Sequence, residues 1–431
     1  MEKHDVIVIG GGAAGFFGAI RYAECCKANG IKPDIILIER TEKILSKVLV
    51  SGGGRCNVTH ACFDPIQLAG YYPRGGAALR GAFTKFQPKD TIQWFKDRGV
   101  EIRAEKDGRM FPVTNKSATI ADCLLATAQK AGVDVRTRIW VRSMKRSADG
   151  EHSIRLAVTD GNLGLESELS AKAVLFASGG TPQVHQLLAT SGITMVPAVP
   201  SLFTFMIQDE RLAGIPGLAV ESTSAAFIEV DRQYPAPMQI GPTLITHWGL
   251  SGPAILRLSA WGARRLAARE YHDRIRVNWL HPKNADDVFD VCQKIRNDHV
   301  FGRKTVLVNS AFSQIPLRMW KNFVASLGII ETKKWAEMNN RELRMLAEML
   351  VGMELSVQGK GVYKDEFVTA GGVDLGQVNF KDMQSRQVPG IFFAGEVLDV
   401  DGITGGFNFQ NAWTTAWLAG GGLYDFVQAV N

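Results

Sequence analysis

The sequence predicts an α/β protein in which a Rossmann-like, dinucleotide-binding domain is interrupted by an inserted domain of strands and helices. Three observations lead to this prediction. A strand, glycine turn, helix and strand pattern fills the first forty residues, prolines begin to punctuate the chain near residue 197, and a buried-strand pattern returns near residue 391. Buried strands that alternate with helices are typical of a parallel sheet covered on both faces. We expect residues 1–195 and 352–431 to form the first domain, and residues 196–351 the insert.

The opening pattern begins with Val6–Ile9, an apolar run without a polar face, which predicts a strand buried on both sides. A glycine turn at residues 10–15 follows, and then a helical stretch that ends near Asn29. A second apolar run, Ile35–Ile38, leads directly into Glu39. A GxGxxG turn in this context is typical of dinucleotide binding.

Each glycine of this turn has a physical role. Gly10 permits the tight turn, Gly12 lets the backbone approach a pyrophosphate, and Gly15 lets the helix pack close to the strand. The helix N-terminus offers unpaired N–H groups and a partial positive charge to the phosphates. Glu39 can accept hydrogen bonds from ribose hydroxyls. This stretch alone predicts a dinucleotide and leaves NAD(P) and FAD as alternatives.

The amino-acid composition limits the classes of protein to which this chain can belong. A chain of 431 residues suggests two or three structural units, and 46% hydrophobic with 21% charged residues indicates a folded core. The formal net charge of +6 is mild and does not by itself indicate nucleic acid. No apolar run reaches the roughly 18–20 residues of a membrane helix, and we see no signal peptide. Six cysteines, two of them adjacent, do not suggest a disulfide framework, so we expect a cytoplasmic protein.

Two further glycine-rich stretches follow the opening pattern. The first is Ser51–Asn57, in which Gly52–Gly54 would weaken a helix or strand by roughly 0.5–1 kcal/mol each and fit backbone lying flat against a ligand. The second, Ser178–Gly180, directly follows the buried run Ala173–Ala177. This pattern indicates another place where a sheet edge meets a ligand.

The insert is marked by prolines and by a different pattern of elements. Strand-like pieces at 202–207 and 224–230 precede helical patterns at 254–268, 285–298, 317–327 and 341–350. We expect the strand patterns at 354–357 and 364–369 to return to the first domain.

A second strand, acid and glycine loop occurs late in the chain. The buried run Ile391–Ala394 precedes Gly395-Glu396, and a glycine loop leads to a helix that starts near Asn408. FAD is an extended cofactor that a late strand and a late helix N-terminus commonly hold. Backbone N–H groups at Gly406–Asn408 would face the flavin N1–C2=O edge, where negative charge collects on reduction. A simple nicotinamide enzyme does not need this loop, so the loop favours FAD.

Several motifs together carry a family resemblance. They are Gly10–Gly15, Lys47, Ser51–Asn57, Gly108–Pro112, Thr246–Pro253, Val368–Val373 and Gly395–Asn408. In this order they resemble the bacterial YhiN/BaiN-like flavoproteins, which are NAD(P)/FAD-dependent or aminoacetone-oxidase-like. The resemblance implies a FAD-binding domain of glutathione-reductase type, an insert with a β-barrel and helices, and bound FAD.

The cofactor-binding residues expected from the motifs and the resemblance follow the chain from the opening turn to the late loop. They are Gly10, Gly12, Ala13, Ala14, Gly15, Glu39, Arg40, Lys47, Ser51, Gly52, Gly53, Gly54, Asn57, Val135, Ser178, Gly179, Gly395, Glu396, Thr404, Gly405, Gly406, Phe407 and Asn408. One segment departs from the family pattern. Thr181–Leu187 replaces the glycine-rich loop that follows residue 180 in most members, so substrate choice or a flavin contact can differ.

The sequence gives only weak candidates for catalysis. Arg55 can bind an anionic group, and His247 can handle a substrate proton, although an interior hydrogen-bonded histidine is an equal alternative. The first interpretation of Cys56 is a small apolar residue that fills space in the core. A redox disulfide between Cys56 and Cys62 is a further alternative. His185, in the divergent loop, is weaker still.

The sequence leaves several reactions as alternatives. We expect a FAD-dependent oxidoreductase that acts on a small organic molecule, with NAD(P)H as a transient donor for reduction of a conjugated C=C or C=O system. Oxidation of an amine with oxygen is an alternative. An RNA-binding flavoprotein is another, because Arg136, Arg138, Arg142, Lys145 and Arg146, and Arg264, Arg265 and Arg269, are clustered. We expect no metal site, and the sequence does not predict an oligomeric state.

Overall fold

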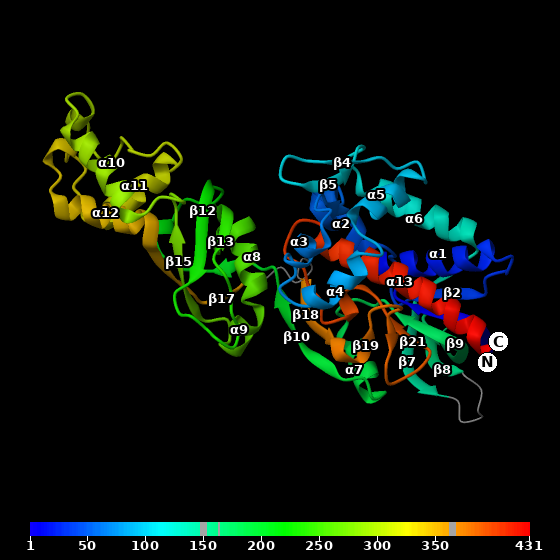
Figure 1. The fold of residues 1–431 in the computed structure, drawn as a ribbon. Coiled ribbons are helices and arrows are strands. Elements are labelled where there is room, and N and C mark those ends of the chain that lie inside the picture. Colours follow the sequence, from blue (N-terminus) through cyan, green and yellow to red (C-terminus); the bar gives the residue numbers. More distant parts are fainter. Residues whose placement is uncertain (147–152, 163, 362–367) are drawn as a thin grey trace. The chain divides into compact units, whose positions relative to one another are not determined.

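The computed structural model describes residues 1–146, 153–162, 164–361 and 368–431. The chain divides into two compact units, shown as ribbons in Figure 1. The first comprises Met1–Ala198 and Val368–Asn431, and the second Val199–Phe367. Each unit has its own sheet and its own buried core. The predicted mixed α/β fold class, with a barrel-like insert, is confirmed.

The first unit is built around five parallel strands in the order β21-β9-β1-β2-β6. Their bounds are Ile391–Phe393, Leu165–Phe176, Glu2–Ile9, Ile35–Glu39 and Asp134–Thr137. Val6 lies opposite Ile35 on one side and Ala173 on the other. Residues 6–9 and 35–38 are buried, as expected for strands with neighbours on both faces.

Antiparallel strands extend this sheet. β7 (Ile139–Arg146) and β8 (Ile154–Asp160) form a meander with β9, and β19 (Val378–Asn379) and β20 (Gln384–Ser385) lie beside β21. A small separate sheet contains β3 (Thr59–His60), β5 (Arg109–Pro112) and β4 (Ile102–Ala104).

Helices α1 (Ala13–Ala28) and α13 (Phe407–Val430) pack on each other over the central sheet, with α6 (Ser117–Ala131) beyond α1 (Figure 1). The two long helices approach closely because a Cβ on Gly420 would lie 2.7 Å from the Gly18 carbonyl oxygen. The Phe17 ring of α1 contacts the Trp413 and Trp417 rings of α13, at 5.2 and 6.3 Å between ring centres. The remaining helices of the unit are α2 (Ser46–Gly54), α3 (Pro65–Ala69), α4 (Gly76–Phe83), α5 (Pro88–Lys96) and α7 (Pro182–Thr190).

The second unit contains a nearly closed antiparallel barrel. Its strand order is β16-β15-β12-β13-β14-β11-β17. Their bounds are Met353–Val357, Asp273–Asn278, Ala219–Phe227, Gln239–Ile245, Gly249–Ser251, Phe205–Met206 and Gly359–Lys360. The end strands β16 and β17 are consecutive in the chain, so residues 353–360 close the sheet on itself by pairing with β15 and then with β11.

This closure corrects one boundary. Residues 352–361 were expected in the first domain, but β16 pairs with β15, so this segment belongs to the barrel. The expected strand at 364–369 falls partly on residues 362–367, which lie outside the described residues. The described part of that region begins with β18 (Val368–Val373), which pairs with β10 (Met195–Ser201).

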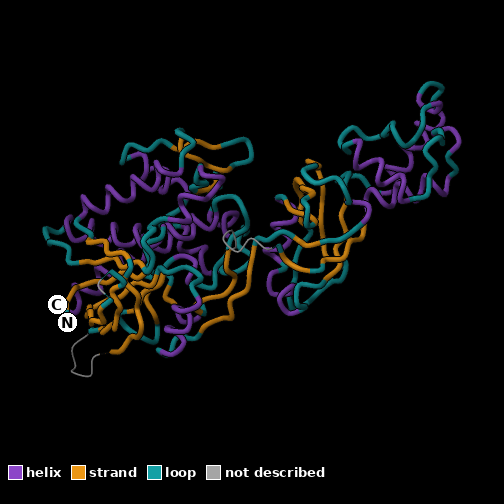
Figure 2. The backbone as a smooth tube through the Cα atoms, turned by 180° about the vertical axis from the view of Figure 1, so that it is seen from behind, coloured by secondary structure: helices purple, strands orange, loops and turns teal. Residues whose placement is uncertain are grey.

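Helices complete the second unit. The helices are α8 (Pro253–Trp261), α9 (Ala263–Ala268), α10 (Ala285–Asn297), α11 (Leu317–Ser326) and α12 (Asn340–Gly352). In Figure 2, coloured by secondary structure, α10–α12 gather at one end of this unit, beyond its strands. Trp279, Trp320 and Trp335 are fully buried, and the last two donate their indole N–H groups to the Val306 and Asn309 carbonyls. None of the helices in the described ranges combines the length and apolar character needed to cross a bilayer.

Candidate dinucleotide-binding site

The carboxyl ends of β1, β2, β9 and β21 meet at one edge of the parallel sheet, because parallel strands all end on the same side. Gly10 follows β1 with φ +116°, and a Cβ there would lie 2.5 Å from the Ala177 carbonyl oxygen after β9. Only glycine fits this crossing. The predicted residues that follow these four strands are therefore neighbours.

The turn at residues 10–15, the early turn, leads into α1. A Cβ on Gly15 would lie 1.9 Å from the Gly10 carbonyl oxygen, so the helix packs directly on its own turn. A Cβ on Gly12 would meet nothing within 4 Å, which leaves space beside the backbone. Helix α1 has no side-chain N-cap and no acidic residue in its first turn. Its first N–H groups are thus available to an anion.

Glu39 is fixed at the end of β2. Its Oε2 accepts a hydrogen bond from the Gly11 N–H (2.8 Å), and its Oε1 accepts from the N–H and the hydroxyl of Thr41 (2.8 and 2.9 Å). These bonds orient the carboxylate and leave acceptor capacity on Oε2 for a ribose hydroxyl. The adjacent Arg40 donates to the Gln183 side chain of α7 (3.2 Å).

Helix α2 is broken at its glycines. Ser51 has an extended ψ of 150°, and Gly52, Gly53 and Gly54 follow with φ of +57°, +67° and +80°. Gly52 packs against Asn57 and the Phe111 ring, whereas Gly53 and Gly54 have nothing within 4 Å of a Cβ position. The backbone here is left-handed and open on one side, which suits a flat ligand surface.

Lys47 of α2 reaches the acid that follows β21. Its Nζ lies 2.6 Å from Glu396 Oε2, and Glu396 Oε1 accepts the Thr369 N–H at 2.8 Å. A Cβ on Gly179 would lie 3.6 Å from the same Glu396 carboxylate. Nearby, the Ser178 hydroxyl is buried without a hydrogen-bond partner among the described residues. A buried hydroxyl without a partner fits a position where a ligand supplies one.

The loop at residues 402–408, the late turn, leads into α13. The Asn408 side chain stabilises the late turn through a reciprocal pair of hydrogen bonds with the Gly402 backbone (2.8 and 2.9 Å). Gly406 has φ +94°, and a Cβ there would lie 2.5 Å from the Thr59 carbonyl oxygen. The preceding Asp401 is fully buried and forms a bidentate ion pair with Arg74. Like α1, α13 has no side-chain N-cap and no acid in its first turn.

Gly395, after β21, contacts the first turn of α1 and the second turn of α13. A Cβ on Gly395 would lie 3.0 Å from Ala14 Cβ in α1 and 3.8 Å from Ala412 Cα in α13. The Gly395 N–H also donates to the Thr415 hydroxyl of α13 (2.9 Å). Two uncapped helices thus begin at the same sheet edge. Of the other predicted cofactor residues, Thr404 lies in the late turn, and Val135 lies in β6 opposite Leu37, at the end of the parallel order.

The weak catalytic candidates differ in their surroundings. Arg55 is paired with Glu105 (2.7 Å) and lies over the Phe111 ring. Cys56 is fully buried, and burial raises the pKa of its thiol to about 12, so it is not a thiolate near neutral pH. His247 is exposed in the tight turn Thr246–Gly249 of the second unit. The interior-histidine alternative is therefore wrong, because this hairpin turn places the residue at the surface.

The sequence did not predict several residues that support the late turn. Tyr72 donates its hydroxyl to the Phe407 carbonyl (2.7 Å), and the His60, Tyr71 and Phe407 rings are in mutual contact. His60 follows Asn57 by three residues, so its nearness to the Ser51–Asn57 motif was the available signal. Nothing in the sequence linked Arg74 with Asp401.

Several of the clustered arginines are paired with acids. Arg136 binds Glu2 and Asp134, and Arg138 binds Glu42. In the second unit, Arg265 and Asp273 form a buried pair (2.7 Å). These arginines are engaged within the chain.

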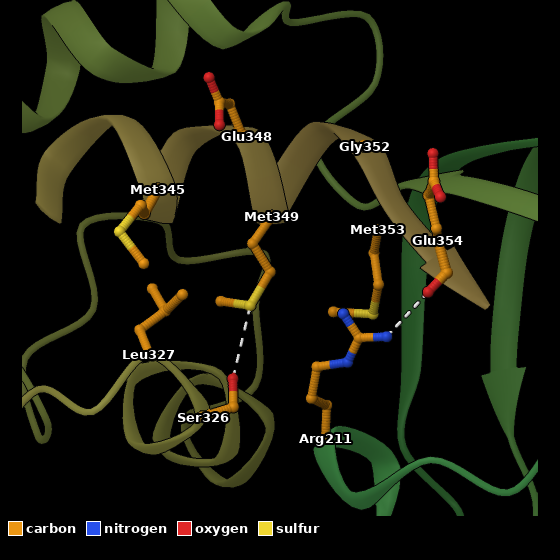
Figure 3. A pocket seen from close by; sticks show the side chains of 9 residues that line it. All are labelled: Arg211, Ser326, Leu327, Met345, Glu348, Met349, Gly352, Met353 and Glu354. Carbon is orange, nitrogen blue, oxygen red and sulfur yellow. Dashed lines mark hydrogen bonds between the residues drawn. The ribbon is translucent and has the colours of Figure 1, made fainter. Parts of the chain in front are cut away.

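A hollow of about 420 Å³ lies in the second unit, and none of the predicted site residues lines it (Figure 3). It is lined by Arg211, Ser326, Leu327, Met345, Glu348, Met349, Gly352, Met353 and Glu354. The Arg211 guanidinium is already bound by Asp209 and by the Glu354 carbonyl.

Comparison with known proteins identifies the family. A family model described as "HI0933-like protein Rossmann domain" matches residues 4–422. The chain belongs to this family, the YhiN/BaiN-like flavoproteins. The ribosomal RNA dihydrouridine synthase of Escherichia coli is 28% identical over 422 residues, 97% of each chain. The 3-dehydro-bile acid delta(4,6)-reductase of Clostridium scindens is 27% identical over 436 residues, 96% of this chain and 97% of that relative.

Solved structures share the fold at low identity. The 3-ketosteroid delta1-dehydrogenase from Sterolibacterium denitrificans matches with a TM-score of 0.51 and 11% identity, over 99% of this chain and 100% of that chain.

Proposed function

We propose that this chain, an FAD-dependent oxidoreductase of the HI0933-like family, reduces a carbon–carbon double bond conjugated with a carbonyl group. The substrate is a small organic molecule, and NAD(P)H is the electron donor. The observation that carries the proposal is the pair of uncapped helix N-termini, α1 and α13, at one edge of a parallel sheet. One helix N-terminus suits the pyrophosphate of a dinucleotide, and the second suits the electron-accepting end of an extended flavin.

The residues at this edge fit FAD. The N–H groups of Gly12, Ala13 and Ala14 would bind the pyrophosphate, and Glu39 would bind the adenosine ribose. Ser178 offers a buried hydroxyl without a partner among the described residues. Gly53 and Gly54 leave open space along the backbone.

The late turn would hold the flavin ring. Gly406 is the N-cap of α13 and Phe407 and Asn408 begin it, and their N–H groups would face the N1–C2=O edge. The Lys47–Glu396 pair lies just after β21, where it would border the cofactor. Bound FAD supplies the hydride transfer at its N5 position. This chain's residues bind the cofactor, orient it and favour the negative charge of its reduced form.

The names of two relatives support the type of bond. One is a delta(4,6)-reductase of a 3-dehydro-bile acid, and the other makes dihydrouridine, which is uridine with a ring C=C bond reduced. Both names describe saturation of a C=C bond. The chemistry that they share is the reduction that we propose.

Uridine in RNA is the second candidate substrate. The relatives named ribosomal RNA dihydrouridine synthase, from Escherichia coli and Haemophilus influenzae, favour it, at 28% and 26% identity over nearly the whole chain. The pairing of Arg136, Arg138 and Arg265 with acids weighs against an RNA surface formed by these residues.

Anaerobic titration of the purified protein tests the proposal. We expect FAD to be bound, its absorbance to bleach with NADH or NADPH, and the colour to return when a conjugated enone is added without oxygen. Return of colour with unmodified ribosomal RNA, but with no small enone, would favour the second candidate. Bleaching by amines, with peroxide formed in air, would indicate an amine oxidase. A protein that binds no FAD would refute the proposal.

A further inference from the structure

His60 is held firmly beside the late turn. It belongs to β3 and pairs with Arg109 of β5. The neighbouring Gly108 has φ +85°, and a Cβ there would lie 2.5 Å from His60 Nε2. The ring therefore packs directly on the Gly108 backbone, in space that a larger residue would fill.

The opposite side of the ring contacts the late turn twice. His60 Nδ1 lies 3.1 Å from the Gly405 carbonyl oxygen, and the imidazole stacks on Phe407 at 4.7 Å between ring centres. A carbonyl oxygen can only accept, so Nδ1 carries a hydrogen in this contact whether the imidazole is neutral or charged. The side chain thus fixes both the direction of the Gly405 carbonyl and the first residue of α13.

The direction of this carbonyl sets the direction of the next N–H group. The peptide bond between Gly405 and Gly406 is trans, so its C=O and N–H groups point in opposite directions. The Gly406 N–H consequently points away from His60. Within the described ranges, no residue accepts a hydrogen bond from this N–H. The other side of Gly406 is closed by the Thr59 carbonyl and the Asn57 side chain.

We infer that His60 is a positioning residue that aims the Gly406 N–H at the N1–C2=O edge of the bound flavin. This inference rests on the proposed function. Reduction places negative charge at that edge, and a donor held in place before reduction stabilises this charge without reorganising. Loss of the His60 hydrogen bond would free the Gly405–Gly406 peptide to rotate, which weakens binding of reduced FAD more than binding of oxidised FAD.

The test is the reduction potential of FAD bound to the full-length protein. His60→Phe keeps a stacking ring but removes the donor, and His60→Asn keeps an amide N–H near the position of Nδ1 but removes the ring. We expect His60→Phe to lower the preference for reduced over oxidised FAD by roughly tenfold, so that the potential becomes more negative. His60→Asn should stay within about threefold of the wild type. Tyr71→Phe is the matched control. It removes only a hydroxyl and keeps the second aromatic ring that contacts Phe407.

The outcomes separate the inference from the proposed function. An unchanged potential in His60→Phe, or equal weakening of reduced and oxidised FAD, would overturn the inference while the wild type still binds FAD. If His60→Phe does not fold, His60→Leu provides a second variant without a donor, judged by the same shift. A wild-type protein without FAD would overturn the proposed function, and the inference with it.

Discussion

The early and late turns perform the same structural task with different support. Both lead into a long helix that lacks a side-chain cap, and both rely on close backbone contacts at glycine. The early turn is fixed mainly by Glu39 and the ends of β1 and β2, within one βαβ unit, and it also crosses Ala177 after β9. The late turn is fixed by His60, Tyr72 and Arg74, which are more than 300 residues away along the chain. The support of a turn can be predicted from the sequence when it comes from neighbouring residues, but not when it comes from distant segments.

The largest expected effect comes from breaking the buried ion pair before the late turn. Asp401 is fully buried, so Asp401→Asn leaves the Arg74 guanidinium without its charged partner and should cost about 3–5 kcal/mol of unfolding free energy. Urea unfolding measures this cost. The double variant Arg74→Met with Asp401→Leu should lose less than the two single variants added together. Additive losses would show that the pair does not act as a unit.

A matched glycine pair tests the early turn. Gly15→Ala places a Cβ 1.9 Å from the Gly10 carbonyl oxygen and should destabilise the protein by about 1–3 kcal/mol, although alanine is normally the better helix residue. Gly12→Ala enters open space, so it should leave stability nearly unchanged and weaken FAD binding. Thermal unfolding of the apoprotein, and FAD titration, measure the two effects. Equal stability losses in both variants would contradict the packing that we describe.

Tyr72→Phe tests the late turn with a smaller change. The variant keeps the buried ring and removes only the hydroxyl that donates to the Phe407 carbonyl, so we expect a loss of about 1 kcal/mol. Chemical denaturation is the measurement. The loss should be accompanied by weaker FAD binding, because Phe407 is the first residue of α13. A stability loss with unaltered FAD affinity would separate this contact from the site.

The smallest effect is expected at Cys56. Burial raises the pKa of its thiol to about 12, so near neutral pH it does not form the reactive thiolate that a redox disulfide requires. In the Cys56→Ala variant, NAD(P)H should therefore reduce the bound flavin at a rate within about twofold of the wild-type rate. Stopped-flow absorbance measures this rate. A loss of a hundredfold or more would restore the disulfide alternative.

Much of the first unit could be predicted because its signals are local. Val6–Ile9 lies in β1, Ile35–Ile38 in β2, and Ala13–Ala28 forms the expected helix, since apolar runs and a glycine turn specify these elements without distant partners. The pairing of β16 could not be predicted. An alternating run indicates a strand but does not say which neighbour it joins, and here the partner is β15 of the barrel.

The residues of the candidate site show the same difference between local and distant signals. Gly10, Gly12, Gly15 and Glu39 were predicted because a spacing pattern encodes them. His60 and the Arg74–Asp401 pair were missed because only the folded chain brings them to the late turn. His247 attracted attention through its motif, but it lies at an exposed hairpin turn of the second unit.

The most direct test of the account is an experimental structure of the protein with FAD. We predict that the pyrophosphate lies within hydrogen-bonding distance of the Ala13 and Ala14 N–H groups, and that the flavin N1–C2=O edge accepts a hydrogen bond from Gly406. A pyrophosphate bound away from α1, or a flavin ring that does not touch the late turn, would contradict the claim that the two turns hold opposite ends of one cofactor.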